Sequence, residues 1–274
     1  MADGALDFRL LGTLEVRRNG AELALGGAKQ RALLAILLIN ANRVVTTDEL
    51  VEWLWPAKAP GKPLTAIQGY VSALRKILDP EHPFNVIVTE AVGYRVPVEP
   101  GELDTLRFEQ LVQRGRAALD RGEPRQAGDA LAEALALFRG PPLVDFAYAS
   151  WASNEIGRFE DLRLVCLEDR IEADLALGRH DELIGELQAL ISDHPLREGF
   201  RTQHMLALYR SGRQAEALDA YQAARSTLVD ELGVEPGGEL RELHEWPNQH
   251  RPPQWREPLA RRGHPAPLHQ PGAL

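Results

Sequence analysis

The chain has 274 residues, of which 44 % are hydrophobic and 26 % charged, and it contains one cysteine, Cys166. At ~100–200 residues per domain this length predicts two domains. The longest strongly apolar run, Ala32–Ile39, is far shorter than the ~20 residues that a membrane helix needs. A single cysteine excludes an internal disulfide and any zinc cluster built on cysteines. We therefore expect a cytoplasmic protein with no membrane partner.

The net charge of −9 conceals three segments of different character. Residues 1–100 carry 11 basic and 11 acidic side chains, whereas residues 101–245 carry 16 arginines, no lysine and 28 acidic side chains. Residues 246–274 are rich in proline and carry 4 arginines and 1 glutamate. These shifts predict an N-terminal domain over 1–100, an acidic domain over 101–245 and a mostly disordered tail over 246–274. Only local charge bears on DNA binding, so the acidic total does not exclude it.

The first 40 residues predict two strands and a helix. Residues Leu6–Val16 alternate well enough for one strand, Arg18-Asn19-Gly20 is a turn signal, and Ala21–Leu25 returns as a second strand. Leucines and isoleucines at helical spacing then predict a helix over Lys29–Ile39.

A short extended link at Val44-Val45 leads into a second helix. Thr46 and Glu49 have the spacing of a capping box, which opens a helix over Asp48–Trp55. The following Pro56–Pro63 contains three prolines and is predicted to be a loop.

The segment Leu64–Leu78 is predicted to be a strongly amphipathic helix that ends at Asp79-Pro80. Its core face carries four aliphatic residues at helical spacing: Ile67, Val71, Leu74 and Leu78. Two short strands around a turn at Glu90–Gly93 follow within Val86–Val98. The order over 1–100 is thus hairpin, three helices and hairpin.

The opposite face of that helix is small and polar, contains no acid and ends in a basic pair. It carries Thr65, Gly69, Ser72 and Lys76, with Gln68 and Arg75 on its shoulder. Small residues permit close approach to a major groove, Gln and Ser or Thr can contact base edges, and the basic pair can hold phosphate or guanine. The alternative is an ordinary solvent-exposed helix face. The sequence of this helix alone does not decide between a DNA-contacting face and a solvent-exposed one.

From about Glu102 onward the sequence is helical in period, and one glycine motif recurs. Gly178 and Gly212 each precede an arginine and are 34 residues apart, which is the period of a tetratricopeptide repeat. Gly122 begins a similar motif 56 residues earlier, which indicates an insertion around Gly140-Pro141-Pro142. We therefore predict a TPR-like all-α array over 101–245, and a fold class that is mainly α with a small β component.

The ordered set of motifs resembles a known family. Ser72–Leu78 (SALRKIL) is similar to the end of the recognition helix in OmpR-type winged helices, and Gly93–Val96 (GYRV) is similar to their wing. Leu10–Val16 (LLGTLEV), Gln68–Ser72 (QGYVS) and the closing segment 232–244 narrow the resemblance to the Streptomyces antibiotic regulatory protein (SARP) family. It covers residues 6–245 and implies an OmpR-type winged helix followed by a bacterial transcriptional activation domain.

The resemblance also implies which residues bind DNA. The recognition-helix positions that it places against the major groove are Thr65, Gln68, Gly69, Ser72, Arg75 and Lys76, and the wing positions are Thr89, Gly93, Tyr94 and Arg95. Tyr94 and Arg95 would anchor or flank the wing. Glu90 stands where a basic wing-tip residue is common, so a weak or displaced wing contact is expected. The loop with Lys58 and Lys62 is either a contact to RNA polymerase or a plain connector.

These features predict a sequence-specific transcriptional activator without enzymatic activity. The resemblance implies binding to direct repeats in promoter DNA as a homodimer, recruitment of RNA polymerase with its sigma factor, and control of antibiotic or other secondary-metabolite genes. The alternative is a TPR-like protein-interaction scaffold that does not contact DNA.

No set of residues predicts a catalytic centre, a metal site or a cofactor. Cys166 lies among aliphatic residues at helical spacing and is predicted to be a buried free thiol. His180 and His194 lie in predicted turns and are expected to be exposed. The phosphate-binding pattern G-x-x-x-x-G-K-[ST] is absent, so no ATPase activity is expected.

Overall fold

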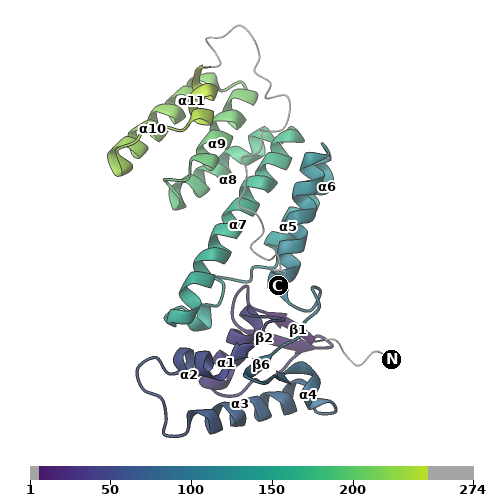
Figure 1. The fold of residues 1–274 in the computed structure, drawn as a ribbon. Coiled ribbons are helices and arrows are strands. Elements are labelled where there is room, and N and C mark those ends of the chain that lie inside the picture. Colours follow the sequence, from purple (N-terminus) through teal and green to yellow (C-terminus); the bar gives the residue numbers. More distant parts are fainter. Residues whose placement is uncertain (1–5, 246–274) are drawn as a thin grey trace. The chain divides into compact units, whose positions relative to one another are not determined.

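The computed structural model of the chain describes residues 6–245 (Figure 1). Its contacts divide the chain into two compact units: unit 1 contains residues up to 114 together with 130–167, and unit 2 contains 115–129 and the chain from 168 onward. This division does not follow the change of composition at residue 100, and the domain bounds drawn from composition stay a prediction. The predicted tail, 246–274, lies outside the described residues. The described residues are mainly helical with two small antiparallel sheets, so the predicted fold class is confirmed.

The N-terminal sheet of unit 1 has three antiparallel strands, β1 (Leu6–Arg9), β2 (Glu15–Arg18) and β3 (Ala21–Glu22), in the order β1-β2-β3. The predicted turn is confirmed, with Asn19 at φ 51° and Gly20 at φ 81°. The prediction of one strand over Leu6–Val16 is wrong, because β1 and β2 pair with each other, Phe8 opposite Val16, and the chain leaves the sheet between them.

The chain leaves the sheet at Leu10 because its backbone hydrogen bonds go to Asp104, the first residue of α5 (Asp104–Asp120). The Asp104 carboxylate accepts the N–H of Leu10 at 2.8 Å and 2.9 Å and the N–H of Leu11 at 2.9 Å. The residue is only 2 % exposed. Burial raises the pKa of Asp104, and the two N–H donors and the charges of Arg139 and Arg107 oppose that rise.

The insertion that the sequence indicates between two repeats packs on the same segment of unit 1. The N–H of Arg139 donates to Leu11 O at 2.9 Å, and the N–H of Leu143 donates to Leu10 O at 2.9 Å. In the opposite direction, the N–H of Leu14 donates to the Asp145 carboxylate at 3.0 Å. Leu143 is fully buried and holds a left-handed backbone, φ 53°, which costs free energy in a residue other than glycine. Residues 139–145 therefore complete the hydrogen bonding of the link between β1 and β2.

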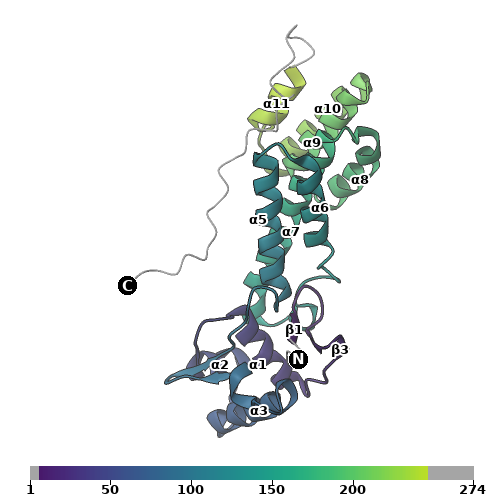
Figure 2. The same cartoon turned by 90° about the vertical axis from the view of Figure 1, so that its right-hand side faces the viewer.

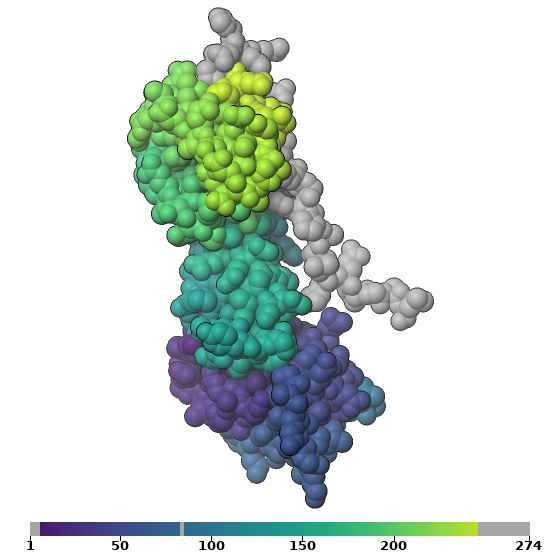
Figure 3. All heavy atoms as spheres, turned by 90° about the vertical axis from the view of Figure 1, so that its left-hand side faces the viewer, coloured from purple at the N-terminus to yellow at the C-terminus, as the bar shows by residue number. Residues whose placement is uncertain are grey.

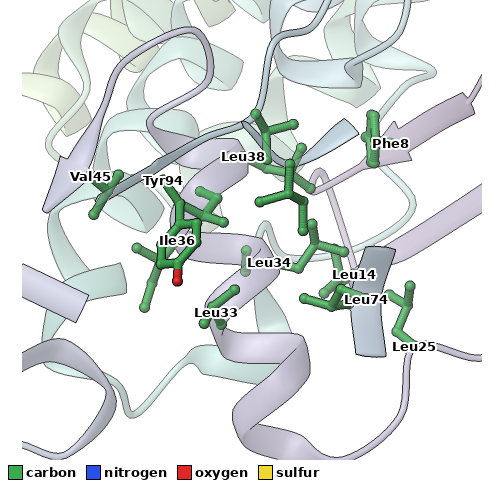
Figure 4. Close-up of a cluster of buried hydrophobic side chains, with 14 of the residues drawn as sticks. Phe8, Leu14, Leu25, Leu33, Leu34, Ile36, Leu38, Val45, Leu74 and Tyr94 are labelled. Atoms are coloured by element: carbon green, nitrogen blue, oxygen red, sulfur yellow. The ribbon is translucent and has the colours of Figure 1, made fainter. Parts of the chain in front are cut away.

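The core of unit 1 is built around α1 (Ala28–Ile39), whose residues 33–38 are all buried. Figure 4 shows Leu33, Leu34 and Ile36 of α1 in one cluster with Val45 and Tyr94. The next helix, α2 (Thr47–Leu54), begins at the predicted capping box, which is confirmed in both directions. The Thr46 hydroxyl accepts the N–H of Glu49, whose carboxylate accepts the N–H of Thr46 at 2.8 Å.

The second sheet of unit 1 has the strand order β4-β6-β5, with β4 (Val45–Thr46), β5 (Val88–Thr89) and β6 (Gly93–Arg95). The predicted hairpin around Glu90–Gly93 is confirmed, whereas Val45 belongs to a strand paired with Tyr94 and not to a simple link. Between β4 and β5 lie α3 (Pro63–Leu78) and the short α4 (Pro83–Val86), which the sequence did not predict.

The remaining elements of the described residues are helical. They are α6 (Pro124–Leu135), η1 (Val144–Phe146), α7 (Ser150–Ala176), α8 (His180–Asp193), α9 (Glu198–Arg210), α10 (Gln214–Leu232) and α11 (Gly238–Glu245). Gly122, Gly178 and Gly212 all have positive φ, 71°, 83° and 73°, and each precedes the next helix by two residues. In all three turns the glycine N–H bonds the carbonyl three residues back, and the following N–H bonds the carbonyl five back. The repeated glycine motif is thus one helix-ending turn used three times.

Helix α9 is the central element of unit 2 and packs against α8, α10 and α11 (Figure 2). Figure 3 shows the outer surface that α10 and α11 present. All residues of α9 from 200 to 208 are buried, four polar side chains among them: Arg201, Thr202, Gln203 and His204. The Arg201 guanidinium donates to Pro195 O at 2.8 Å, and the Gln203 amide donates to Glu168 O at 2.8 Å. His180 and His194, expected to be exposed, are half-buried.

The buried side chain of His204 is expected to make the folded chain less stable in mild acid. Burial lowers its pKa from 6.5, as do the charges of Arg213 and Arg201, while Glu216 opposes them. Because the unfolded chain takes up this proton more readily than the folded chain, the free energy of unfolding falls as pH drops below 6.5. We expect His204→Gln to flatten that fall in urea titrations between pH 7 and pH 5, without abolishing it, since burial also lowers the pKa of His180.

A matched control is His82→Gln, because the His82 side chain is 60 % exposed. This variant should follow the wild-type pH profile. If the free energy of unfolding of His204→Gln fell with pH as steeply as that of the wild type, His204 would not be a cause of the acid sensitivity.

Candidate nucleic-acid interface

Helix α3 has one buried and one exposed face, as the sequence predicts. Its four buried side chains are Ile67, Val71, Leu74 and Leu78. Pro63 occupies the first turn, where its missing N–H has no helical partner in any case, and Arg75 and Lys76 occupy the last turn, where positive charge suits the helix dipole. Figure 1 shows α3 along an outer edge of unit 1, with α1 and α2 on its inner side.

The structure places five of the six predicted recognition-helix residues together on the exposed face. They are Thr65, Gln68, Gly69, Ser72 and Lys76. A Cβ at Gly69 would meet nothing within 4 Å, so the middle of this face is open. The face carries no carboxylate, and its only formal charge is that of Lys76.

Arg75, the sixth residue, is half-buried and directed at the wing. Its Nε donates to Ile87 O at 2.8 Å, and its Nη2 donates to Thr89 Oγ1 at 2.8 Å. Burial lowers the pKa of Arg75, and nearby Tyr94 opposes that effect. The family resemblance assigned Arg75 to DNA, and the helical wheel put it on the shoulder of the polar face. Neither holds information about the contact that Arg75 makes with β5.

The predicted wing residues occupy different environments. Thr89 is exposed, whereas Gly93 and Tyr94 are buried, and Tyr94 belongs to the core of unit 1 with only 7 % exposure. Tyr94 is paired with Val45 on β4 and with Thr89 on β5, and its side chain packs in the core cluster.

Arg95 forms an ion pair with Glu90 at 3.0 Å across the wing turn. The Glu90 carboxylate, which the sequence treats as a lone negative charge, is therefore accompanied by a positive one. The turn itself is closed by the N–H of Glu90, which donates to Gly93 O at 2.9 Å, and it leaves Val92 60 % exposed.

The loop between α2 and α3 leaves Lys58 and Lys62 exposed. Lys62 immediately precedes α3, and its side chain makes no capping hydrogen bond to that helix. Among the described residues, no hydrogen bond or ion pair joins the side chain of Lys58 or Lys62 to the exposed face of α3.

Two other kinds of site are not found in the part of the chain that the structure describes. Residues 6–245 contain no group of three His, Cys, Asp or Glu side chains that could hold a metal ion. None of the helices described there is long and apolar enough to cross a membrane. Cys166 is buried, as predicted, with its thiol 3.7 Å from Leu131 O.

Comparison with known proteins identifies both parts of the chain. Residues 20–96 match the family described as the C-terminal domain of transcriptional regulatory proteins, and residues 103–246 match the bacterial transcriptional activator domain. The solved structure of Mycobacterium tuberculosis EmbR in complex with a low-affinity phosphopeptide superposes with a TM-score of 0.86 at 37 % identity, over 88 % of this chain and 64 % of that one.

Two relatives that are similar over most of this chain are named regulatory proteins. Regulatory protein AfsR of Streptomyces coelicolor is 43 % identical over 88 % of this chain, which spans 24 % of AfsR. Regulatory protein DnrI of Streptomyces peucetius is 38 % identical over 87 % of this chain and 90 % of DnrI. The chain therefore belongs to the SARP family of transcriptional regulators, with an OmpR-type winged helix ahead of a bacterial transcriptional activator domain.

Proposed function

We propose that the chain activates transcription by inserting α3 into the major groove of promoter DNA. The observation that carries this proposal is the exposed face of α3, where five predicted contact residues lie together without a carboxylate. Gln68 and Ser72 have the hydrogen-bonding groups to contact base edges, and Gly69 permits close approach between them. Lys76 holds a phosphate at the end of the helix.

The wing reaches the adjacent minor groove through Arg95, and Thr89 supports it from β5 through its hydrogen bond with Arg75. Gly93 and Tyr94 support this contact from beneath, because both are buried. Because Glu90 neutralises the charge of Arg95, the wing tip attracts phosphates only weakly, and affinity depends strongly on α3 and on a second protomer.

Two protomers bind direct repeats, which supplies the affinity that a head with equal numbers of acids and bases lacks. The exposed loop with Lys58 and Lys62, together with the acidic helical repeats, engages RNA polymerase and its sigma factor. The genes under control are those of antibiotic or other secondary-metabolite synthesis. The protein acts in the cytoplasm, at the nucleoid.

The test is footprinting of the full chain on promoter fragments from its own genomic neighbourhood at two salt concentrations. Protection of tandem repeats that weakens with salt is the expected result. A folded sample that protects no fragment at either salt would refute DNA binding and favour the interaction-scaffold alternative.

Lys76→Ala is expected to weaken binding by roughly threefold to tenfold and to reduce the salt slope by about one ion, because one phosphate contact is lost. Fluorescence anisotropy at several salt concentrations measures both quantities. Arg125→Ala is the matched control, since Arg125 is also an exposed basic residue but lies on α6. If the salt dependence of DNA affinity were the same for Lys76→Ala and Arg125→Ala, Lys76 would not contact DNA.

A further inference from the structure

The side chain of Arg75 connects the recognition helix to the outer strand of the wing. Its Nε and Nη2 both donate to the carbonyl of Ile87, the residue before β5, and Nη2 also donates to the hydroxyl of Thr89 within β5. Ile87 is fully buried in the core of unit 1, whereas Thr89 is exposed. One guanidinium thus holds a buried main-chain atom and a surface side chain of the same short segment.

The other hydrogen bonds that hold the wing go to β4 and to the start of α2, where the Thr47 N–H donates to Val92 O at 3.0 Å, and not to α3. Strand β5 is two residues long and pairs only with β6, which is three residues long and pairs with β4 over two residues. Residues 79–87 separate α3 from β5 along the chain. A two-residue strand is weakly held by its own pairing. The hydrogen bonds from Arg75 on α3 therefore contribute much of what fixes the position of β5.

The chemistry of the cross-link requires arginine. A guanidinium presents several N–H donors in one plane at fixed angles, so it can bond Ile87 O and Thr89 Oγ1 together. An ammonium group has the same charge without this planar fork. Charge alone would therefore be preserved by lysine, whereas the two-point connection would not.

We propose that Arg75 is a positioning residue: it holds the wing at the angle at which α3 and the wing reach adjacent grooves together. This inference rests on the proposed DNA binding, and it assigns Arg75 a role different from that of its neighbour Lys76. Lys76 acts through its charge, and Arg75 acts through the geometry of its donors.

The test compares Arg75→Lys, Thr89→Val and the double variant in the full chain. The probe is the duplex that the wild-type chain selects from a random-sequence pool. Arg75→Lys is expected to bind about tenfold more weakly and Thr89→Val about threefold more weakly, and the double variant no more weakly than Arg75→Lys, because both substitutions break one connection. The salt slope of Arg75→Lys stays close to that of the wild type, since the charge is retained.

Footprinting separates the wing from the helix. In Arg75→Lys we expect loss of hydroxyl-radical protection in the minor groove beside the site, while methylation protection of guanines in the major groove remains. Thr89→Val alters an exposed side chain and should fold normally, so it tests the connection even if Arg75→Lys lowers the melting temperature.

Three results would overturn the assignment. They are wild-type affinity in Arg75→Lys, losses that multiply in the double variant, and minor-groove protection that persists in both single variants. Failure of the proposed function is recognised separately, because the wild-type chain would then select no duplex at all.

Discussion

Asp104→Ala is expected to lower the free energy of unfolding by about 3–5 kcal/mol, because it leaves two buried N–H groups without acceptors at about 1–3 kcal/mol each and opens a small cavity. The carboxylate accepts the N–H groups of Leu10 and Leu11, both fully buried. Urea unfolding of the full chain, followed by circular dichroism, measures the loss.

Two further variants define the cause. Asp104→Asn keeps one carbonyl oxygen but turns an NH₂ group toward one of the donors, so an intermediate loss is expected. Asp129→Ala removes an exposed carboxylate from α6 and should change stability by less than about 0.5 kcal/mol. If Asp104→Ala and Asp129→Ala unfolded at the same urea concentration, the acceptor role of Asp104 would be wrong.

The sequence could predict the parts of the fold whose hydrogen bonds are local, and not those whose partners lie far away along the chain. The capping box of Thr46 and Glu49 and the glycine turns at Gly178 and Gly212 were predicted because each is complete within a few residues of chain. The single strand over 6–16 was wrong because its interruption is caused by Asp104, more than 90 residues away. Alternation of residue types holds no information about such a partner.

The insertion at Gly140–Pro142 shows a second limit. Its composition indicates a break in the repeat, but the packing of the adjoining residues in unit 1 depends on the backbone of Leu10 and Leu11. Leu143 has a left-handed backbone in the core, a conformation that a sequence pattern assigns to glycine. Only the folded unit can compensate for that conformation.

For the candidate interface, helical periodicity predicted the exposed face of α3 but not the direction of each long side chain. Thr65 and Ser72 are short enough that position on the helix decides their exposure. Arg75 is long enough to reach a neighbouring strand, and the contact it makes there depends on β5. The sequence likewise placed Glu90 at the wing tip without the ion pair to Arg95, which requires the register of the hairpin.

Gly93→Ala is expected to destabilise unit 1 by about 3 kcal/mol and to abolish DNA binding, because the added methyl group has no space. An ideal Cβ at Gly93 would lie 1.9 Å from Val45 O and 2.8 Å from Thr46 Cα, and both are backbone atoms that no rotamer change can move. The pairing of β4 with β6 must therefore open. Thr46 also caps α2, so the displacement reaches the helix before the recognition helix as well as the wing.

Gly69→Ala is the matched control for stability. Its Cβ would enter open space on a helix, where alanine is more favourable than glycine by about 0.5–1 kcal/mol. Thermal unfolding of the two variants should therefore shift in opposite directions from the wild type. If Gly93→Ala unfolded at the wild-type temperature, β4 and β6 would have to be further apart than the structure shows.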